Sequence, residues 1–172
     1  MDPFSILSAT GTALRITKIL SDILNKLITQ TNNADRNLQQ LYQEVTSFAN
    51  VLQLLNNDFS DHRMRVAAFE TQTGNVGAHW NAVTQAIVKC NERLDELQKL
   101  LMRVDGSSRV ASSGLVKGFK LNYAIGDIVF YQSEIRRYRE NIALSLNMMI
   151  VYVSDYPERR TASILTREIG VA

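Results

Sequence analysis

Large apolar residues recur at alternating steps of three and four positions in four long segments of the chain. These steps place the apolar residues on one face of a helix and the polar residues on the other. The segments run over about residues 3–28, 34–59, 78–104 and 115–153. Each apolar face leaves water only if the helices pack together, so the pattern predicts an all-α bundle of four long amphipathic helices.

Shorter stretches interrupt this pattern. Residues 60–72 are the least regular part of the chain, and they can form one more short helix. Thr73 to Gly77 is a predicted break because two glycines lie in it. Residues 105–114 form the clearest predicted loop, since Gly and Ser dominate them.

Pro157 marks the predicted end of the last helix. The residue before a proline disfavours the helical conformation, so Tyr156–Pro157 should stop the helix. The chain then divides into a helical bundle domain over residues 1–153 and a charged tail or linker over residues 154–172.

The composition is that of an ordinary single domain, because 45% of the 172 residues are apolar and 21% are charged. The net charge of +2 gives no argument for nucleic acid, and we expect no such partner. The single cysteine, Cys90, excludes a disulfide within the chain. The start at Met1–Phe4 lacks the basic region of a signal peptide, so we expect a cytoplasmic protein at rest.

Residues that usually carry catalysis or bind metals are few and poorly spaced. His62 and His79 fit no metal-binding spacing with Cys90, which occupies a core-facing position where a thiol is unreactive. Gly74 and Gly77 lack the lysine that ends a phosphate-binding loop. We expect no catalytic residue, no cofactor and no metal site, and therefore no enzyme. Three nearby carboxylates are expected on a solvated helix face: Glu92, Asp95 and Glu96.

The last helix carries a basic group made of Arg136, Arg137 and Arg139. A salt-bridged helix face explains it, with pairs such as Arg136–Glu140, and a contact with anionic lipid or phosphate is the alternative. Arg139 stands at a seam position that is otherwise apolar. It can form a polar layer with Gln132, or its charged end can reach the surface.

The first helix is amphipathic and begins with an uncharged run from Pro3 to Leu14. As a helix this run is about 18 Å long, which is shorter than the roughly 30 Å of bilayer hydrocarbon. Its small residues suit close helix packing in lipid, and they equally suit tight packing in a soluble bundle. The candidate membrane-active residues are Phe4, Ile6, Leu7, Ala9, Ala13 and Leu14, and the candidate lipid head-group contacts are Arg15, Lys18 and Lys26.

Three stretches resemble fungal HeLo-like N-terminal domains, which stand at the front of NOD-like (STAND) receptors and related cell-death proteins. They are Met1-Asp2-Pro3-Phe4-Ser5-Ile6, the pattern from Leu41 to Leu55, and the pattern from Glu134 to Leu146. The resemblance covers most of residues 1–153. It implies a helical bundle that, when clustered, releases its N-terminal helix to bind and permeabilise a membrane in programmed cell death or heterokaryon incompatibility.

The charges in the first helix limit how it can enter a bilayer. Arg15, Lys18 and Lys26, with Asp22, each cost about 2.5–3.5 kcal/mol at the bilayer centre, whereas a large apolar residue returns only about 0.3–0.6 kcal/mol. One helix should therefore lie in the membrane interface, and spanning requires several copies. Membrane damage should then depend steeply on protein concentration.

The resemblance also implies partners: self-association on activation, anionic lipid of the plasma membrane, and an upstream receptor or signalling protein. A soluble helical adaptor with no membrane activity is the alternative function. Charge substitution at Leu7 and Leu14 separates the two, because it abolishes toxicity in the first case and mainly destabilises the bundle in the second.

Overall fold

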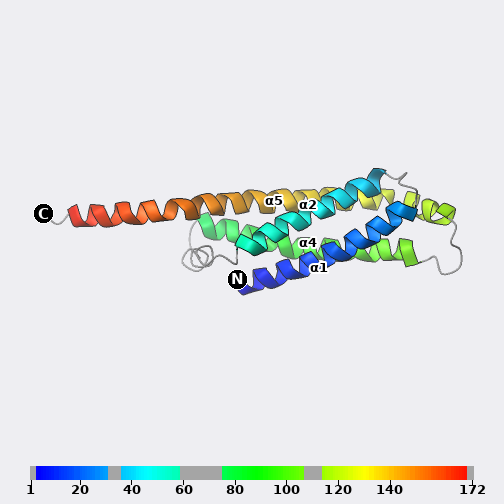
Figure 1. Ribbon diagram of the computed structural model, residues 1–172, viewed down its shortest axis with the longest axis horizontal. Helices are drawn as coiled ribbons and strands as arrows, with labels where there is room; N and C mark the ends of the chain where they lie inside the picture. Colours follow the sequence, from blue (N-terminus) through cyan, green and yellow to red (C-terminus); the bar gives the residue numbers. More distant parts are fainter. Residues whose placement is uncertain (1–2, 31–35, 59–74, 107–113, 170–172) are drawn as a thin grey trace.

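Every element that is described in the computed structural model is a helix, which confirms the predicted all-α bundle. The elements are α1 (Pro3–Gln30), α2 (Arg36–Asp58), α4 (Asn75–Gly106) and α5 (Gly114–Ile169), and these ranges are the residues that the structure describes (Figure 1). Side chains are described for residues 6–30, 36–58, 79–105 and 124–151. The short helix predicted near residues 60–72 lies outside the described residues.

The four helices form a square bundle. α1 lies against α2 and α4, and α5 lies against the same two helices, so α1 and α5 occupy opposite corners. Successive helices run in alternating directions along the long axis (Figure 1). The neighbours α1 and α4 therefore run parallel, as do α2 and α5. The connection from α2 to α4 joins two helices at opposite corners of the square.

The predicted apolar stripes form a single core. The stripe of α2 is fully buried from Leu38 to Leu55, and that of α4 is buried from Trp80 to Val104. Burying one large apolar side chain stabilises the fold by about 1.5–3 kcal/mol, so no helix is stable without the other three. Among the core residues with no exposed surface are Leu41, Phe48, Leu52, Ile87, Leu94, Leu101, Ile128, Ile135 and Ile142.

Two predicted helix boundaries are wrong. α5 passes through Pro157 and ends at Ile169, and its C-terminal part extends beyond the end of the other three helices (Figure 1). Proline removes one backbone hydrogen bond, but Glu, Arg, Ala and Leu after Pro157 favour helix on its far side. α4 begins at Asn75, so Gly77 lies in its first turn, where backbone amides have no helical partner in any case. The division into domains at residue 153 stays a prediction.

Candidate functional site

The predicted membrane-active face of α1 lies inside the bundle. Ile6 and Ala13 are fully buried, and Leu7, Ala9 and Leu14 are partly buried and pack against the core. The side chain of Phe4 lies outside the described side chains. Lipid could therefore reach this face only if α1 left its place between α2 and α4.

The buried stripe of α1 changes character along the helix. In the C-terminal half (residues 18–30) it consists of leucines without exposed surface: Leu20, Leu24 and Leu27. In the N-terminal half (residues 3–17) small and polar residues join the aliphatic ones: Ile6, Thr10, Ala13, Ile16 and Thr17. Thr10, Ala13 and Thr17 each bury less apolar surface than a leucine, so these three positions contribute less hydrophobic free energy to docking.

One hydrogen bond ties the N-terminal half of α1 to α4. Asn91 Nδ2 donates to the backbone oxygen of Ala9 at 3.0 Å. The Asn91 Oδ1 and Thr10 Oγ1 atoms are buried, and neither has a hydrogen-bond partner among the described residues. Thr12 and Thr17, by contrast, donate to backbone oxygens of their own helix at 3.1 and 2.9 Å. Around Ala9 and Thr10 the contact with α4 thus combines an inter-helix hydrogen bond with two unpaired polar atoms.

The three predicted head-group cations are exposed, but they differ in their contacts. Lys26 Nζ lies 2.7 Å from Asp105 Oδ2, an ion pair that joins the C-terminal ends of α1 and α4. Arg15 and Lys18 point to solvent from the middle of α1. Because the apolar face points inward, the cations of α1 lie on the outer surface of the resting bundle.

A charged cluster joins α2 to α5. Glu44 is 9% exposed, and its Oε1 accepts hydrogen bonds from Arg136 Nε at 2.9 Å and Nη2 at 2.6 Å. Arg139 Nη2 lies 3.4 Å from Glu44 Oε2 and 3.8 Å from Glu140 Oε1. The bond to Glu44 raises the pKa of Arg136, so this arginine keeps its charge. Arg136, which was expected to pair within its own helix, thus pairs with the neighbouring helix.

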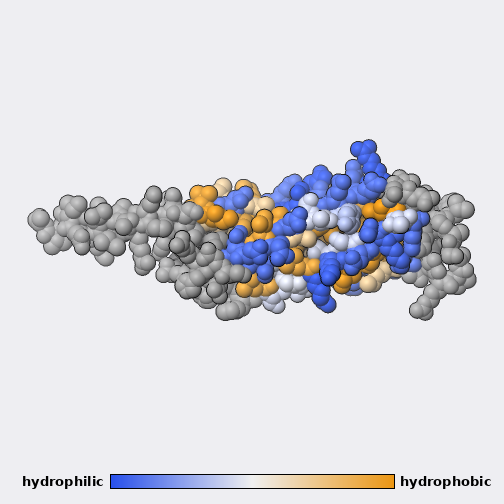
Figure 2. All heavy atoms as spheres, viewed as in Figure 1, coloured by the Kyte–Doolittle hydropathy of each residue, from blue (hydrophilic) through white to orange (hydrophobic). Residues whose placement is uncertain are grey.

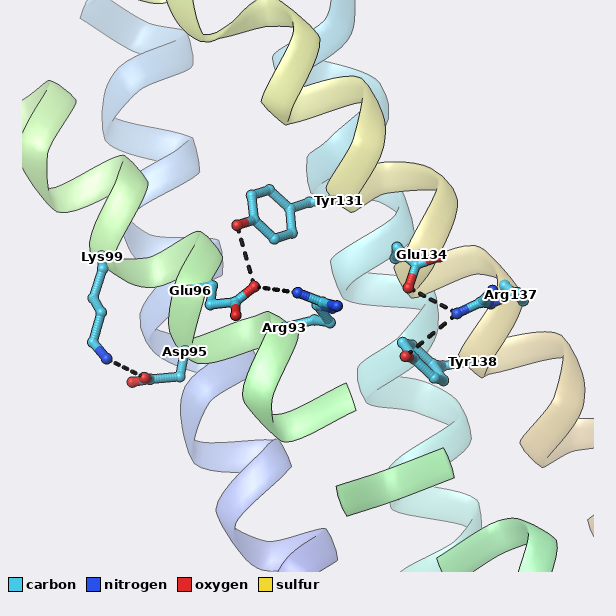
Figure 3. Close-up of polar contacts among 8 residues, drawn as sticks. All are labelled: Arg93, Asp95, Glu96, Lys99, Tyr131, Glu134, Arg137 and Tyr138. Carbon is cyan, nitrogen blue, oxygen red and sulfur yellow. Dashed lines mark hydrogen bonds and ion pairs between the residues drawn. The ribbon is translucent and has the colours of Figure 1, made fainter. Parts of the chain in front are cut away.

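The α4–α5 face carries exposed ion pairs (Figure 3). Arg93 Nη1 lies 2.7 Å from Glu96 Oε2, and the Tyr131 hydroxyl donates to the same oxygen at 3.4 Å. Arg137 Nη2 lies 2.8 Å from Glu134 Oε2. Glu92, Asp95 and Glu96 are all exposed, which confirms the predicted solvated face. Exposed ion pairs of this kind contribute at most about 1 kcal/mol each to the stability of the fold. This face is therefore ordinary charged surface and not a functional site.

The family of the chain follows from comparison with known proteins. Residues 1–161 match the family model described as the pigment biosynthesis cluster protein PigL N-terminal domain. The chain belongs to this family. It is a family of fungal N-terminal domains, and the match covers α1, α2, α4 and most of α5. No curated protein and no solved structure matched the chain.

In this PigL-type domain Arg139 and Gln132 do not form one polar layer. Both are half-buried, and Arg139 lies against Glu44 with 29% of its side chain exposed. The two residues are seven positions apart, about 10 Å along the helix axis, and no described contact joins them. The polar layer that the structure shows is therefore Arg139 with Glu44.

Cys90 of the PigL-type domain is a core residue, as predicted. It has no exposed surface, and burial and then the charge of Glu134 raise the pKa of its thiol. A thiol in this state is a poor nucleophile. Among the described residues no group of three or more His, Cys, Asp or Glu side chains is placed to hold a metal ion.

Sequence reasoning missed three residues of this arrangement: Glu44, Thr10 and Asn91. Glu44 directly precedes the seam residue Val45, which was the available signal that a charge would lie at a helix interface. Thr10 lies four positions after Ile6 and three before Ala13, so its place on the buried stripe could be found. Asn91 gives no such signal, since its partner is a backbone oxygen of another helix.

Proposed function

We propose that this domain executes cell death at a membrane, and that clustering of several copies frees α1 to bind and permeabilise the bilayer. The observation that carries the proposal is the construction of α1. The apolar residues of α1, such as Ile6 and Ala13, face inward, while Arg15 and Lys18 face outward. A freed helix of this kind has the apolar face and the cationic flank that bind an anionic membrane surface.

The charge pattern determines what the freed helix does. Arg15, Lys18, Asp22 and Lys26 occupy its polar side, and each costs about 2.5–3.5 kcal/mol at the bilayer centre. A single α1 therefore lies in the interface, and several copies together place these charges against water or one another. The proposal accordingly includes self-association on activation and a move from the cytoplasm to the plasma membrane.

Among the described residues no helix is long and apolar enough to cross a membrane.

The partners of this proposal are anionic lipid, further copies of the chain, and an upstream receptor or signalling protein that gathers them. The resemblance to HeLo-like domains supports this set, and membership of a family of fungal N-terminal domains agrees with a position in front of other modules. Activity should rise more steeply than linearly with protein concentration, because several copies act together.

Dye release from anionic liposomes tests the proposal. The full chain is fused to an inducible oligomeriser and compared with the double variant Arg15→Glu/Lys18→Glu, whose substitutions lie on the exposed side of α1. The matched control is Arg36→Glu/Lys89→Glu, which makes the same charge change at exposed positions of α2 and α4. Circular dichroism checks that every fusion stays helical.

We expect leakage from the clustered parent and from the control, and a loss of at least tenfold in the α1 variant. Equal leakage from both variants would show that Arg15 and Lys18 are not needed as contacts with lipid head groups. No leakage from any folded, clustered form would contradict membrane execution and leave the adaptor function.

A soluble adaptor is the second candidate, and an exposed apolar strip on α5 favours it. Leu144, Met148 and Val151 are 59%, 50% and 64% exposed, and their spacing places them on one face of the helix. Apolar side chains gather over this end of α5 and over α2 in the surface view (Figure 2). Acidic substitution at Leu144 and Met148 would abolish assembly with a protein partner and leave liposome leakage unchanged if this function is correct.

A further inference from the structure

The N-terminal half of α1 differs from the rest of the bundle in its intrinsic helix stability as well as in its packing. Residues 8–13 read Ser-Ala-Thr-Gly-Thr-Ala, so four of six positions carry residues with below-average helix propensity. Gly11 is exposed, and a Cβ atom built on it would meet nothing within 4 Å. Neither a close contact nor packing requires the glycine, and its main physical effect is to weaken the helix there.

The contact of this half with α4 is equally weak. Thr10 is fully buried, and its hydroxyl has no hydrogen-bond partner in the described part of the chain. The side-chain nitrogen of Asn91 donates to the Ala9 backbone oxygen, while the side-chain oxygen of Asn91 has no partner among the described side chains and backbone. A buried polar atom without a partner loses its hydrogen bonds to water on docking and recovers them on opening. Each of these two atoms therefore favours the open state over the docked state.

We infer that residues 3–17 of α1 open as a unit before the rest of the bundle, and that Thr10, Gly11 and the Asn91–Ala9 hydrogen bond set the equilibrium of this opening. Local opening of this kind occurs in the segments of a fold that have the lowest local stability. The inference rests on the proposed function only in its consequence, which is that these residues regulate the release of α1. The opening itself is measurable in solution without any membrane.

Amide hydrogen exchange on the full chain tests the inference through two substitutions that close the unit. Thr10→Val keeps the branched shape and removes the unpaired hydroxyl, so exchange of amides 7–17 should slow at least fivefold. Gly11→Ala should slow the same amides about threefold by raising helix propensity. Gly126→Ala is the matched control, because Gly126 on α5 is also exposed with nothing within 4 Å of a built Cβ. It should leave amides 7–17 unchanged.

A third substitution opens the unit. Asn91→Asp removes the donor to the Ala9 oxygen and puts a carboxylate beside it, so amides 7–17 should exchange at least tenfold faster. Asn141→Asp, at an exposed position of α5, makes the same chemical change away from α1 and should have no effect on them. If the Asn91 variant fails to fold, the two closing substitutions still test the inference.

Cys90 supplies an independent measure of opening of the whole core. It is the single cysteine of the chain, it is fully buried on α4, and it can react with a thiol reagent only when the core opens. The openings that expose amides 7–17 should be far more frequent than the openings that expose Cys90 to the thiol reagent. Thr10→Val and Gly11→Ala should slow exchange of these amides more than they slow labelling of Cys90.

Two outcomes would overturn the inference: equal opening constants for amides 7–17 and Cys90, or equal slowing of all four helices by Thr10→Val and Gly11→Ala. Either would mean that α1 opens only when the whole bundle unfolds. The failure of the proposed function looks different, because local opening would then be present in solution while clustered protein released no dye.

Discussion

Two interfaces of the bundle each join parallel neighbours, and they differ in the polar contacts that cross them. Between α2 and α5, Glu44 pairs with two charged side chains, Arg136 and Arg139, although Glu44 Oε2 and Arg139 Nε are buried without a hydrogen bond to any described residue. Between α4 and the start of α1, one amide bonds to one backbone oxygen, and two buried polar atoms stay unpaired. The difference indicates that α2 and α5 form the fixed part of the fold and that the start of α1 is the detachable part.

The largest difference in stability is expected when one aliphatic side chain is shortened in each half of α1. Leu24→Ala should lower the free energy of unfolding by about 3 kcal/mol, because Leu24 is fully buried among leucines. Ile6→Ala removes an equally buried side chain, yet the loss should stay below about 1 kcal/mol, since it cannot exceed the free energy that docks the N-terminal half. Urea unfolding measures both, and equal losses would show that α1 docks as one rigid helix.

The charged cluster gives the next largest effect. Glu44→Ala should lower the free energy of unfolding by about 2 kcal/mol, because the partly buried Arg139 loses the nearer of its two carboxylate partners. The loss is smaller than for a fully buried pair, since half of the Arg136 side chain is exposed. Glu92→Ala, on the exposed side of α4, is the control and should change stability by less than about 0.5 kcal/mol. A loss at Glu44 no larger than that of the control would contradict the fixed α2–α5 interface.

The buried thiol predicts a dependence of stability on pH. Burial raises the pKa of Cys90 above its ordinary value of 9.0, so above that pH the unfolded chain loses a proton that the folded chain keeps. The free energy of unfolding should therefore fall by about 1.4 kcal/mol per pH unit from pH 9 upward, and be unaffected by Cys90 below it. The difference in slope between the parent and Cys90→Ala isolates this contribution. Identical slopes would place the thiol in contact with water.

The smallest effect is expected at the far end of α1. Lys26 pairs with Asp105 at 2.7 Å, but 54% of the lysine side chain is exposed. Lys26→Ala should therefore lower the free energy of unfolding by about 0.5 kcal/mol or less, and the effect should vanish in high salt. A loss of several kcal/mol would mean that this pair, rather than the leucines, anchors the C-terminal half of α1.

The sequence predicts the helices and their buried faces well because each stripe repeats over many turns. The stripe from Leu38 to Leu55 and the position of Cys90 follow from spacing alone, since one helix period fixes the face of every residue. The helix end is harder to predict. Pro157 has a strong local preference against helix, but strong helix formers after it allow α5 to continue.

Contacts between helices are the part that spacing does not determine. The pairing of Arg136 with Glu140 is visible within one helix, whereas its partner Glu44 depends on how α2 is rotated against α5. The hydrogen bond from Asn91 to the Ala9 oxygen depends on the depth at which α1 sits beside α4. The predicted face of α1 was found from its pattern, but the weakness of its docking needed the structure.

The most direct test of the central claim compares the opening of α1 with membrane damage in the same proteins. Dye release from anionic liposomes is measured for the clustered parent, Thr10→Val and the control Gly126→Ala, at equal protein concentration. If α1 must leave the bundle to act, Thr10→Val slows leakage at least fivefold, in step with its slower amide exchange, and Gly126→Ala leaks like the parent. Equal leakage from all three proteins, with exchange slowed only by Thr10→Val, would show that membrane damage does not depend on the release of α1.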